Sequence, residues 1–394
     1  MIDYYRIKSP LTQITETRMS DYIASLENEL GEKLQSVYID KFSKDDFSLL
    51  YVASGGSEAY FLEIFDEIKD RPCYILTSGD SNSLAASMEI LSYLNTHGGA
   101  GEIIHGDVKK VAERIKSLRN IARIKKELSG KNYGCIGHPS DWLIASSFSP
   151  EAVKEKIGMG FVYIEIQELI DEVNKKQYEE NEYTALIKTK DFNKDEVEKA
   201  LWVYGAVKRL CLKYNLSAVS VRCFDLLDTV FTTGCLALAI LNAEGIYAGC
   251  EGDIPALLSM AVIGTVTGAR CFLCNPSRFD TAEMSAVFAH CTIPIDMPAD
   301  FTLNTHFESG IGVAIQGTFR EEPCTVFKCS GDLGRYHVQE GYILPWEYSD
   351  MLCRTQIKLH LDDFSYFLTN PINNHHIICL GQHAKAVEDF FNSL

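Results

Sequence analysis

From Phe47 onward, short β-forming runs alternate with stretches of helical periodicity, and this alternation constrains the possible folds more than any other feature of the chain. The run FSLLYVAS is followed by a turn and a helical stretch, and RPCYILTS is followed by the helical pattern SNSLAASMEILSYL. Strands that alternate with helices are typical of βαβ units and a parallel sheet. A strongly charged helical region, Lys109–Ser129, ends at Gly130, so we predict a first α/β domain over residues 1–130.

A second series of the same kind begins at YGCIGHP. We predict a helix over Asn193–Leu212, because Asn193 suits the N-cap position and apolar residues recur at helical spacing after it. The runs SAVSVRC, IYAGC and RCFLC follow as predicted strands, with two apolar helical stretches between them. This series predicts a second α/β domain over residues 131–277.

The pattern changes in the last third of the chain. Segments such as GVAIQGTF, CTVFKC and TQIKLHLDDF resemble strands, with Gly, Pro and Asn between them, and a final helix is predicted over Ala384–Phe391. Residues 278–394 are therefore predicted to form a β-rich C-terminal domain. The predicted fold class is α/β, with two Rossmann-like parallel-sheet N-terminal domains followed by this β-rich domain.

The charge balance excludes two classes of partner. Asp and Glu number 54 and Lys and Arg 37, and the formal net charge of −17 repels nucleic-acid backbones and anionic membrane surfaces. The N-terminus lacks the apolar segment of a signal peptide, and the longest apolar stretch, Ile254–Val266, is too short to span a bilayer. The 13 cysteines are odd in number and lie in apolar segments, which favours reduced core residues and a cytoplasmic location.

Polar residues follow three successive predicted strands of the second domain. SAVSVRC runs into Asp225, IYAGC runs into Glu251 and Asp253, and RCFLC runs into Asn275. Ligands of open parallel sheets bind beyond the carboxyl ends of the strands, so we expect these side chains to share one edge of the sheet.

Each of these residues also has a structural explanation. Asp253 precedes Ile254-Pro255, and Pro fits the first turn of a helix, so Asp253 is expected to be an N-cap. Asp225 is equally compatible with a cap or a turn. Glu251 is different, because a carboxylate at the end of an apolar strand must be paired, hydrated or bound to a metal. The CxxC spacing of Cys271 and Cys274 lies inside an apolar strand and is interpreted as core.

The segment CEGDIPALLSMAVIGTVTGARCFLCNPS resembles the metal-site segment of L-fucose isomerases, in which a Glu opens a helix and an Asp ligand ends the next strand. Position 275, which lies 24 residues after Glu251 as in that family, is Asn instead of Asp. Asn374-His375 with Gly381 matches the third ligand segment of the family. The chain is also similar to arabinose isomerases, whose extra His ligand is matched by His290, and to short fucose-isomerase-like proteins in the motifs SGGSE, PSDWLIAS and THFESG.

The resemblance implies a metal-dependent aldose–ketose isomerase that acts on a sugar through an ene-diol. Its metal, Mn²⁺ or another divalent ion, is expected to be held by Glu251, Asn275, His290 and His375. Glu251 is expected to act also as the catalytic base, and Asp253 is the second candidate catalytic residue. With Asn at position 275, the possible replacement carboxylates are Asp253, Asp225 and Glu308.

Further residues are expected to contact the sugar, namely Trp142, Asp225, His306, Glu308 and His376. His306 and Glu308 are predicted to alternate along a strand and to share one face. The expected partners are a small-molecule sugar and further copies of the chain, in a homo-oligomer with three or six subunits.

Three other interpretations remain open at this point. The chain is compatible with a non-catalytic sugar-binding relative, which the Asn at position 275 favours. It is also compatible with another metal-assisted reaction, such as epimerisation or dehydration of a sugar or sugar acid. An unrelated α/β protein, whose polar sheet edge consists only of caps and turns, is the third.

Overall fold

The computed structural model describes residues 1–12, 16–42 and 47–394, and it divides the chain into two compact units, Met1–Lys126 and Glu127–Leu394. Among the described residues of the first unit, five parallel strands form one sheet in the order β2-β1-β3-β4-β5. These strands are β1 (Ile2–Ile7), β2 (Leu34–Ser36), β3 (Ser48–Val52), β4 (Cys73–Leu76) and β5 (Gly101–Ile104). Its helices are α1 (Glu16–Leu30), α2 (Ile39–Phe42), α3 (Glu58–Ile68), α4 (Ser83–Thr96) and the start of α5 (Val108–Leu128).

The second unit begins with a parallel sheet of four strands in the order β7-β6-β8-β9, within residues 127–394, all of which are described. The strands are β6 (Asn132–Ile136), β7 (Gly160–Ile164), β8 (Leu216–Val221) and β9 (Tyr247–Cys250). The accompanying helices are α6 (Pro150–Ile157), α7 (Ile166–Val173), α8 (Glu182–Lys188), α9 (Lys194–Lys213), α10 (Asp225–Thr229), α11 (Cys235–Ala243) and α12 (Ile254–Thr267). Asn193 caps α9 as predicted, since its side chain accepts from the backbone N–H groups of Asp195 and Glu196.

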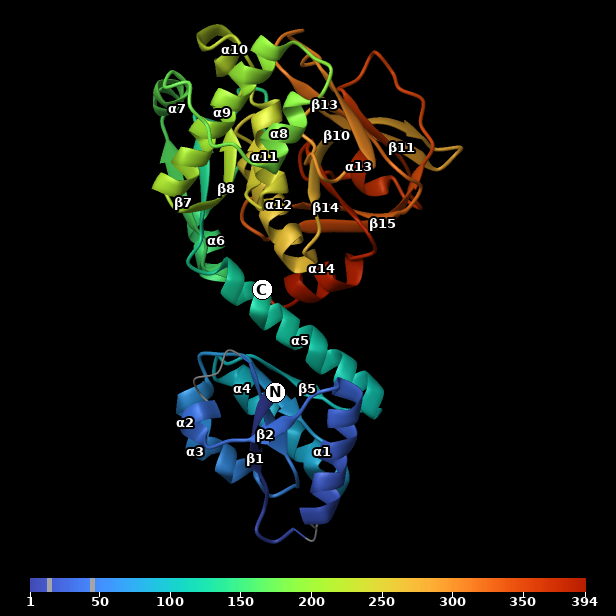
Figure 1. The fold of residues 1–394 in the computed structure, drawn as a ribbon. Helices are drawn as coiled ribbons and strands as arrows, with labels where there is room; N and C mark the ends of the chain where they lie inside the picture. The colour runs from blue at the N-terminus through green and yellow to red at the C-terminus, as the bar shows by residue number, and fades with distance from the viewer. Residues whose placement is uncertain (13–15, 43–46) are drawn as a thin grey trace. The chain divides into compact units, whose positions relative to one another are not determined.

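The rest of the second unit is a closed antiparallel barrel in the order β10-β11-β16-β15-β14-β17, with the ribbon β12-β13 beside it (Figure 1). The barrel strands are β10 (Cys271–Asp280), β11 (Ser285–His290), β14 (Pro323–Cys329), β15 (Tyr336–Leu344), β16 (Thr355–His360) and β17 (His376–Leu380). The ribbon consists of β12 (Asp300–Asn304) and β13 (Ala314–Thr318), and the last helices are α13 (Ser365–Thr369) and α14 (Ala384–Phe391). The predicted fold class is confirmed: two parallel sheets precede a β-rich part.

One predicted strand belongs to a different sheet. RCFLC was expected to extend the second parallel sheet, but β10 pairs antiparallel with β11 and β17 in the barrel. A buried apolar run has the same pattern in a parallel and an antiparallel strand, so the periodicity did not distinguish the two. Asn275 consequently lies within β10, opposite Ala289, and not at the end of a parallel strand.

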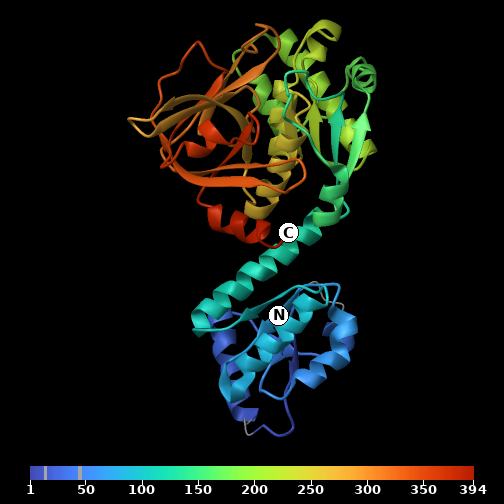
Figure 2. The same ribbon diagram turned by 180° about the vertical axis from the view of Figure 1, so that it is seen from behind.

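Helix α12 lies between the parallel sheet and the barrel, as the views in Figures 1 and 2 both show. Every residue from Ile254 to Val266 is buried, which is typical of a helix that packs on all sides. One apolar core joins the sheet, α9, α11 and the barrel interior. The ends of the barrel strands are therefore held close to the start of α12, where the candidate site lies. Among the described residues, no helix combines the length and apolarity needed to cross a membrane.

Candidate metal site

Glu251 occupies a strained position between β9 and α12. Its φ of 63° lies in the left-handed region, which is unfavourable for a residue with a side chain, and such strain is concentrated at functional sites. Gly252 also has a positive φ, and a Cβ there would lie 2.6 Å from the carbonyl oxygen of His138. The next residue, Asp253, caps α12, since its Oδ1 accepts from the backbone N–H of Ala256 at 2.9 Å. The predicted N-cap is thus confirmed.

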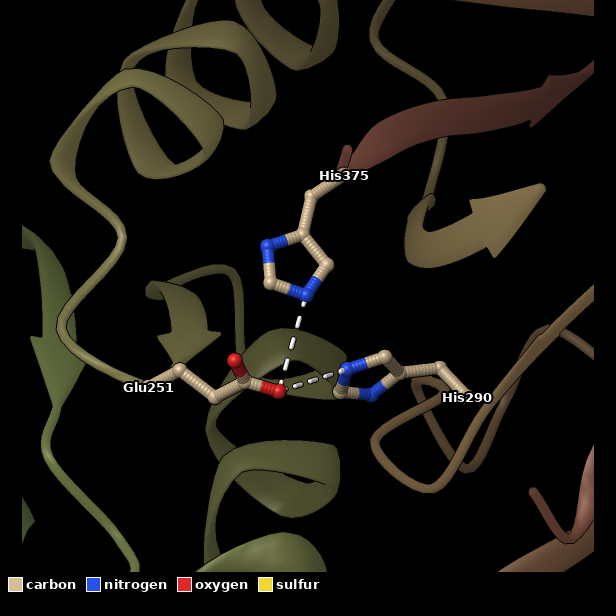
Figure 3. A group of neighbouring side chains, drawn as sticks. All are labelled: Glu251, His290 and His375. Carbon is tan, nitrogen blue, oxygen red and sulfur yellow. Dashed lines mark ion pairs between the residues drawn. The ribbon is translucent and has the colours of Figure 1, made fainter. Parts of the chain in front are cut away.

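Two histidines face the Glu251 carboxylate from the barrel. The Nε2 atoms of His290, at the end of β11, and His375, just before β17, lie 3.8 Å and 3.6 Å from Glu251 Oε1. Figure 3 shows both rings pointing toward this oxygen from different segments of the chain. The three side chains offer donor atoms that lie within 4.8 Å of one another, a spacing compatible with one metal ion.

The other ring nitrogens of both histidines are engaged. His375 Nδ1 lies 2.8 Å from Asp253 Oδ2, and His290 Nδ1 lies 2.9 Å from the Thr292 hydroxyl. In the neutral ring with Nδ1–H donated to Asp253, which is the form that binds a metal, Nε2 of His375 presents a lone pair to the Glu251 carboxylate. Among the described residues this buried nitrogen has no hydrogen-bond partner. A cation between the two acceptors satisfies both, so the donor set fits a divalent metal.

The electrostatics of the three residues are strongly coupled. Burial raises the pKa of Glu251, but the interactions with His290 and His375 outweigh burial and hold this pKa well below its usual range. Burial lowers the pKa of His375, whereas Asp253 and Glu251 together raise it to about 9. Without a metal, the protonated imidazole of His375 therefore supplies the positive charge between two buried carboxylates.

Asn275 lies at the same end of the barrel. It pairs with Ala289, the neighbour of His290, and its Oδ1 accepts from the side-chain amide of Asn374, the neighbour of His375. Three of the four predicted ligands thus face one another, and Asn275 lies on the strand between the other two barrel segments.

The residues predicted to bind sugar fall into two groups. Trp142 is close to the site, because its Nε1–H donates to Glu251 Oε2 at 2.6 Å. His306 packs edge-on against Phe224 at 5.6 Å, and burial together with the nearby His290 lowers its pKa to about 4. The other group, Asp225 and His376, makes its contacts with Arg222 and Tyr366. Asp225 accepts from Arg222 Nε at 3.1 Å, and His376 Nε2 lies 3.0 Å from the Tyr366 hydroxyl.

The predicted strand that carries His306 and Glu308 is wrong. Residues 305–310 form a turn, in which Gly310 N–H donates to the His306 carbonyl and Ser309 Oγ bonds to His306 Nδ1. Gly310 has a φ of 69°, which extended backbone does not allow, so period-two alternation does not apply here. Glu308 is exposed on this turn.

Sequence reasoning missed the role of Arg222. Its guanidinium donates to the Pro139 carbonyl at 2.9 Å, to Asp141 at 3.2 Å and to Asp225 at 3.1 Å. It therefore ties the loop after β6 to the loop after β8 beside Glu251. No pattern in the sequence signals this role, because the partners lie 81 and 83 positions away.

The second unit is thus an α/β sheet joined to a barrel, with a candidate metal site of one carboxylate and two imidazoles where they meet. Comparison with known proteins shows that the chain is 23% identical over 278 residues to sulfoquinovose isomerases of Priestia aryabhattai and Priestia megaterium. These matches cover 67% of this chain and 60% of each relative, so they span less than two thirds of the relatives' length. A sulfoquinovose isomerase of a Clostridium species is 24% identical over 192 residues, which is 46% of this chain and 42% of the relative. No protein-family model matches the chain.

Proposed function

We propose that this protein is a metal-dependent aldose–ketose isomerase. The observation that carries the proposal is the convergence of Glu251, His290 and His375, with a buried His375 Nε2 aimed at the Glu251 carboxylate. The similarity to sulfoquinovose isomerases supports isomerisation of a sugar as the reaction.

In this proposal the chain supplies the ligands and the base. Glu251, His290, His375 and Asn275 would hold a divalent cation such as Mn²⁺, which when bound would supply Lewis-acid polarisation of the sugar carbonyl. Glu251 takes the proton from C2 of the aldose and returns it to C1, and the proton of the C2 hydroxyl moves to O1, so the reaction passes through an ene-diol. Asp253 has a supporting role, because one of its oxygens caps α12 and the other holds His375 Nδ1.

The first substrate to assay is sulfoquinovose, because that sugar gives the similar curated proteins their name. We propose Trp142 and His306 as pocket residues, since both rings pack edge-on against Phe224 and Trp142 also bonds to Glu251. The roles of Asp225, Glu308 and His376 in sugar binding stay predictions. On the family resemblance we also propose a cytoplasmic homo-oligomer of three or six subunits.

A Mn²⁺ titration of metal-free protein by calorimetry tests the site. We expect tight binding by the wild type and a loss of at least about 10-fold in affinity for His375→Ala, which removes one of the donors. Glu251→Gln, which keeps the shape of the side chain but cannot take a proton, should lower turnover by at least about 100-fold. Turnover is followed by NMR as conversion of aldose into ketose, and near-normal activity of Glu251→Gln contradicts the assignment.

A second candidate function is sugar binding without turnover, and Asn275 is the observation that favours it. Asn stands where the fucose-isomerase pattern has an Asp ligand, so the site carries one negative charge fewer. Failure of the wild type to bind Mn²⁺, together with binding by Asn275→Asp, would support this candidate. Formation of an epimer or a dehydrated product would instead indicate another metal-assisted reaction.

A further inference from the structure

Trp142 combines an exposed ring with a hydrogen bond to a largely buried carboxylate. The side chain is 52% exposed, yet its indole N–H donates to Glu251 Oε2 at 2.6 Å. A hydrogen bond to an ionised carboxylate is about twice as strong as one between neutral groups. Burial of apolar surface therefore does not explain the orientation of this ring, whereas the bond to Glu251 does.

The loop that carries Trp142 is fixed at several points. Ser140 N–H donates to the backbone carbonyl of Glu251 at 2.9 Å, so the loop and the strained residue are joined by main-chain and side-chain bonds. Arg222 holds the same loop through Pro139 and Asp141. The indole ring also packs edge-on against Phe224 with a centroid distance of 5.0 Å. These contacts hold the N–H donor in one direction before any ligand arrives.

The two oxygens of Glu251 consequently have different partners. Oε1 faces the Nε2 atoms of both histidines, and Oε2 accepts from Trp142. The last torsion of a Glu side chain has broad energy wells, so packing alone defines the plane of the carboxylate poorly. A fixed donor on Oε2 removes this freedom and leaves Oε1 turned toward the imidazoles.

We propose that Trp142 is a positioning residue, whose indole N–H holds Oε2 of Glu251 so that Oε1 stays directed at His290 and His375. The proposal rests on the proposed metal site and adds a role that differs from stacking on a sugar face. A stacking residue needs only its aromatic ring, whereas a positioning residue needs the N–H. Trp142→Phe separates the two, because it keeps an aromatic ring and removes the donor.

The experiment is a Mn²⁺ titration of full-length, metal-free wild type, Trp142→Phe and the control Trp202→Phe. Trp202 lies on α9, where its ring contacts Lys176, so the control removes a tryptophan outside the site. Loss of partners that orient metal ligands lowers affinity about 10- to 100-fold, and we expect at least a 10-fold weaker Kd for Trp142→Phe. Trp202→Phe should bind within twofold of the wild type.

A readout that needs neither metal nor turnover accompanies the titration. In a protein labelled with ¹⁵N at tryptophan, the indole N–H resonance of Trp142, assigned by elimination with Trp202→Phe and Trp346→Phe, should shift when Glu251 is replaced by Ala. The indole resonances of the other tryptophans, at positions 202 and 346, should stay in place. This measurement keeps the proposal testable even where Trp142→Phe folds poorly.

The outcomes are distinguishable. Equal Kd values for Mn²⁺ in the wild type and Trp142→Phe would overturn the positioning role but not the proposed metal site. A Trp142 indole resonance that does not shift in Glu251→Ala would have the same meaning. Failure of the wild type to bind Mn²⁺ would overturn the proposed function and this role together.

Discussion

His337 lies on β15 with its ring stacked on Tyr366, at a centroid distance of 3.6 Å and an interplanar angle of 3°. Its Nε2 has no hydrogen-bond partner among the described residues. Burial lowers the pKa of His337 to about 4, against the smaller opposing effects of Gln339 and Asp363. The folded chain therefore accommodates this ring in its neutral form.

The pH dependence of stability follows from this shift. The unfolded chain takes up a proton on His337 near pH 6.5, whereas the folded chain does so near pH 4, so folding loses stability as pH falls through this window. His337→Phe keeps the stack on Tyr366 and removes the titration. Between pH 7 and 4 we expect the wild type to lose about 1–2 kcal/mol more than the variant, after allowance for the partial exposure of the ring. Urea unfolding at a series of pH values measures the difference, and parallel curves would contradict it.

At the residue scale, the sequence alone singled out only Glu251, because its position after an apolar strand is poor for packing. His290 and His375 were grouped with it through the spacing of a family pattern, and the structure brings the three together. The bond between Trp142 and Glu251 was outside the reach of any local pattern, because it joins residues 109 positions apart. Such contacts depend on tertiary geometry that a single sequence does not contain.

At the scale of the element, Gly264 shows how closely α12 packs on the sheet. A Cβ at this position would lie 2.6 Å from the Cζ of Tyr247 in β9, which is closer than real contacts allow. Replacing Gly by Ala in an exposed helix stabilises it by about 1 kcal/mol, because Ala loses less backbone entropy. Here the clash with the partly buried ring of Tyr247 should reverse that sign.

We therefore expect Gly264→Ala to lower the free energy of unfolding by about 1–3 kcal/mol, as overpacked cores do. Urea denaturation measures this change. Tyr247→Ala removes the ring that the new methyl group meets, so the double variant should be less destabilised than the sum of the single variants. If the destabilisation of the double variant equals the sum of the two single variants, the new methyl group does not clash with the Tyr247 ring and the prediction is wrong.

Several elements could be predicted because their signals are local. Asp253 followed by Pro255 predicted the start of α12, and the last helix was predicted at its observed bounds, Ala384–Phe391. The turn at residues 305–310 was missed, because its side-chain bond between Ser309 and His306 leaves no distinct signature in the sequence. Asp253 also shows that a cap and a site residue need not be alternatives, since its two oxygens serve α12 and His375.

At the scale of the whole molecule, alternation of strands and helices predicted the two parallel sheets, with RCFLC wrongly added to the second, and the loss of that alternation predicted the β-rich part. Closure of the barrel could not be predicted. It depends on β10 pairing with β17 and β14 pairing with β17, which join segments far apart in the chain. The division at residue 277 stays a prediction, and the sheet and barrel share one apolar core across it.

All candidate ligands and their partners belong to the second unit, Glu127–Leu394, whose main core is also formed within it. Glu251, His290 and His375 come from the loop after β9 and from the barrel, and the residues that orient them, Asp253 and Trp142, lie in the same unit.

A unit with its own core can fold alone. We therefore expect a fragment of residues 127–394 to unfold cooperatively and to bind Mn²⁺ with a Kd within about threefold of the full chain, because no donor is removed. Thermal unfolding and calorimetry measure both properties. A folded fragment that binds at least about 10-fold more weakly would show that residues 1–126 contribute to the site, because a tenfold change in Kd corresponds to about 1.4 kcal/mol of binding free energy.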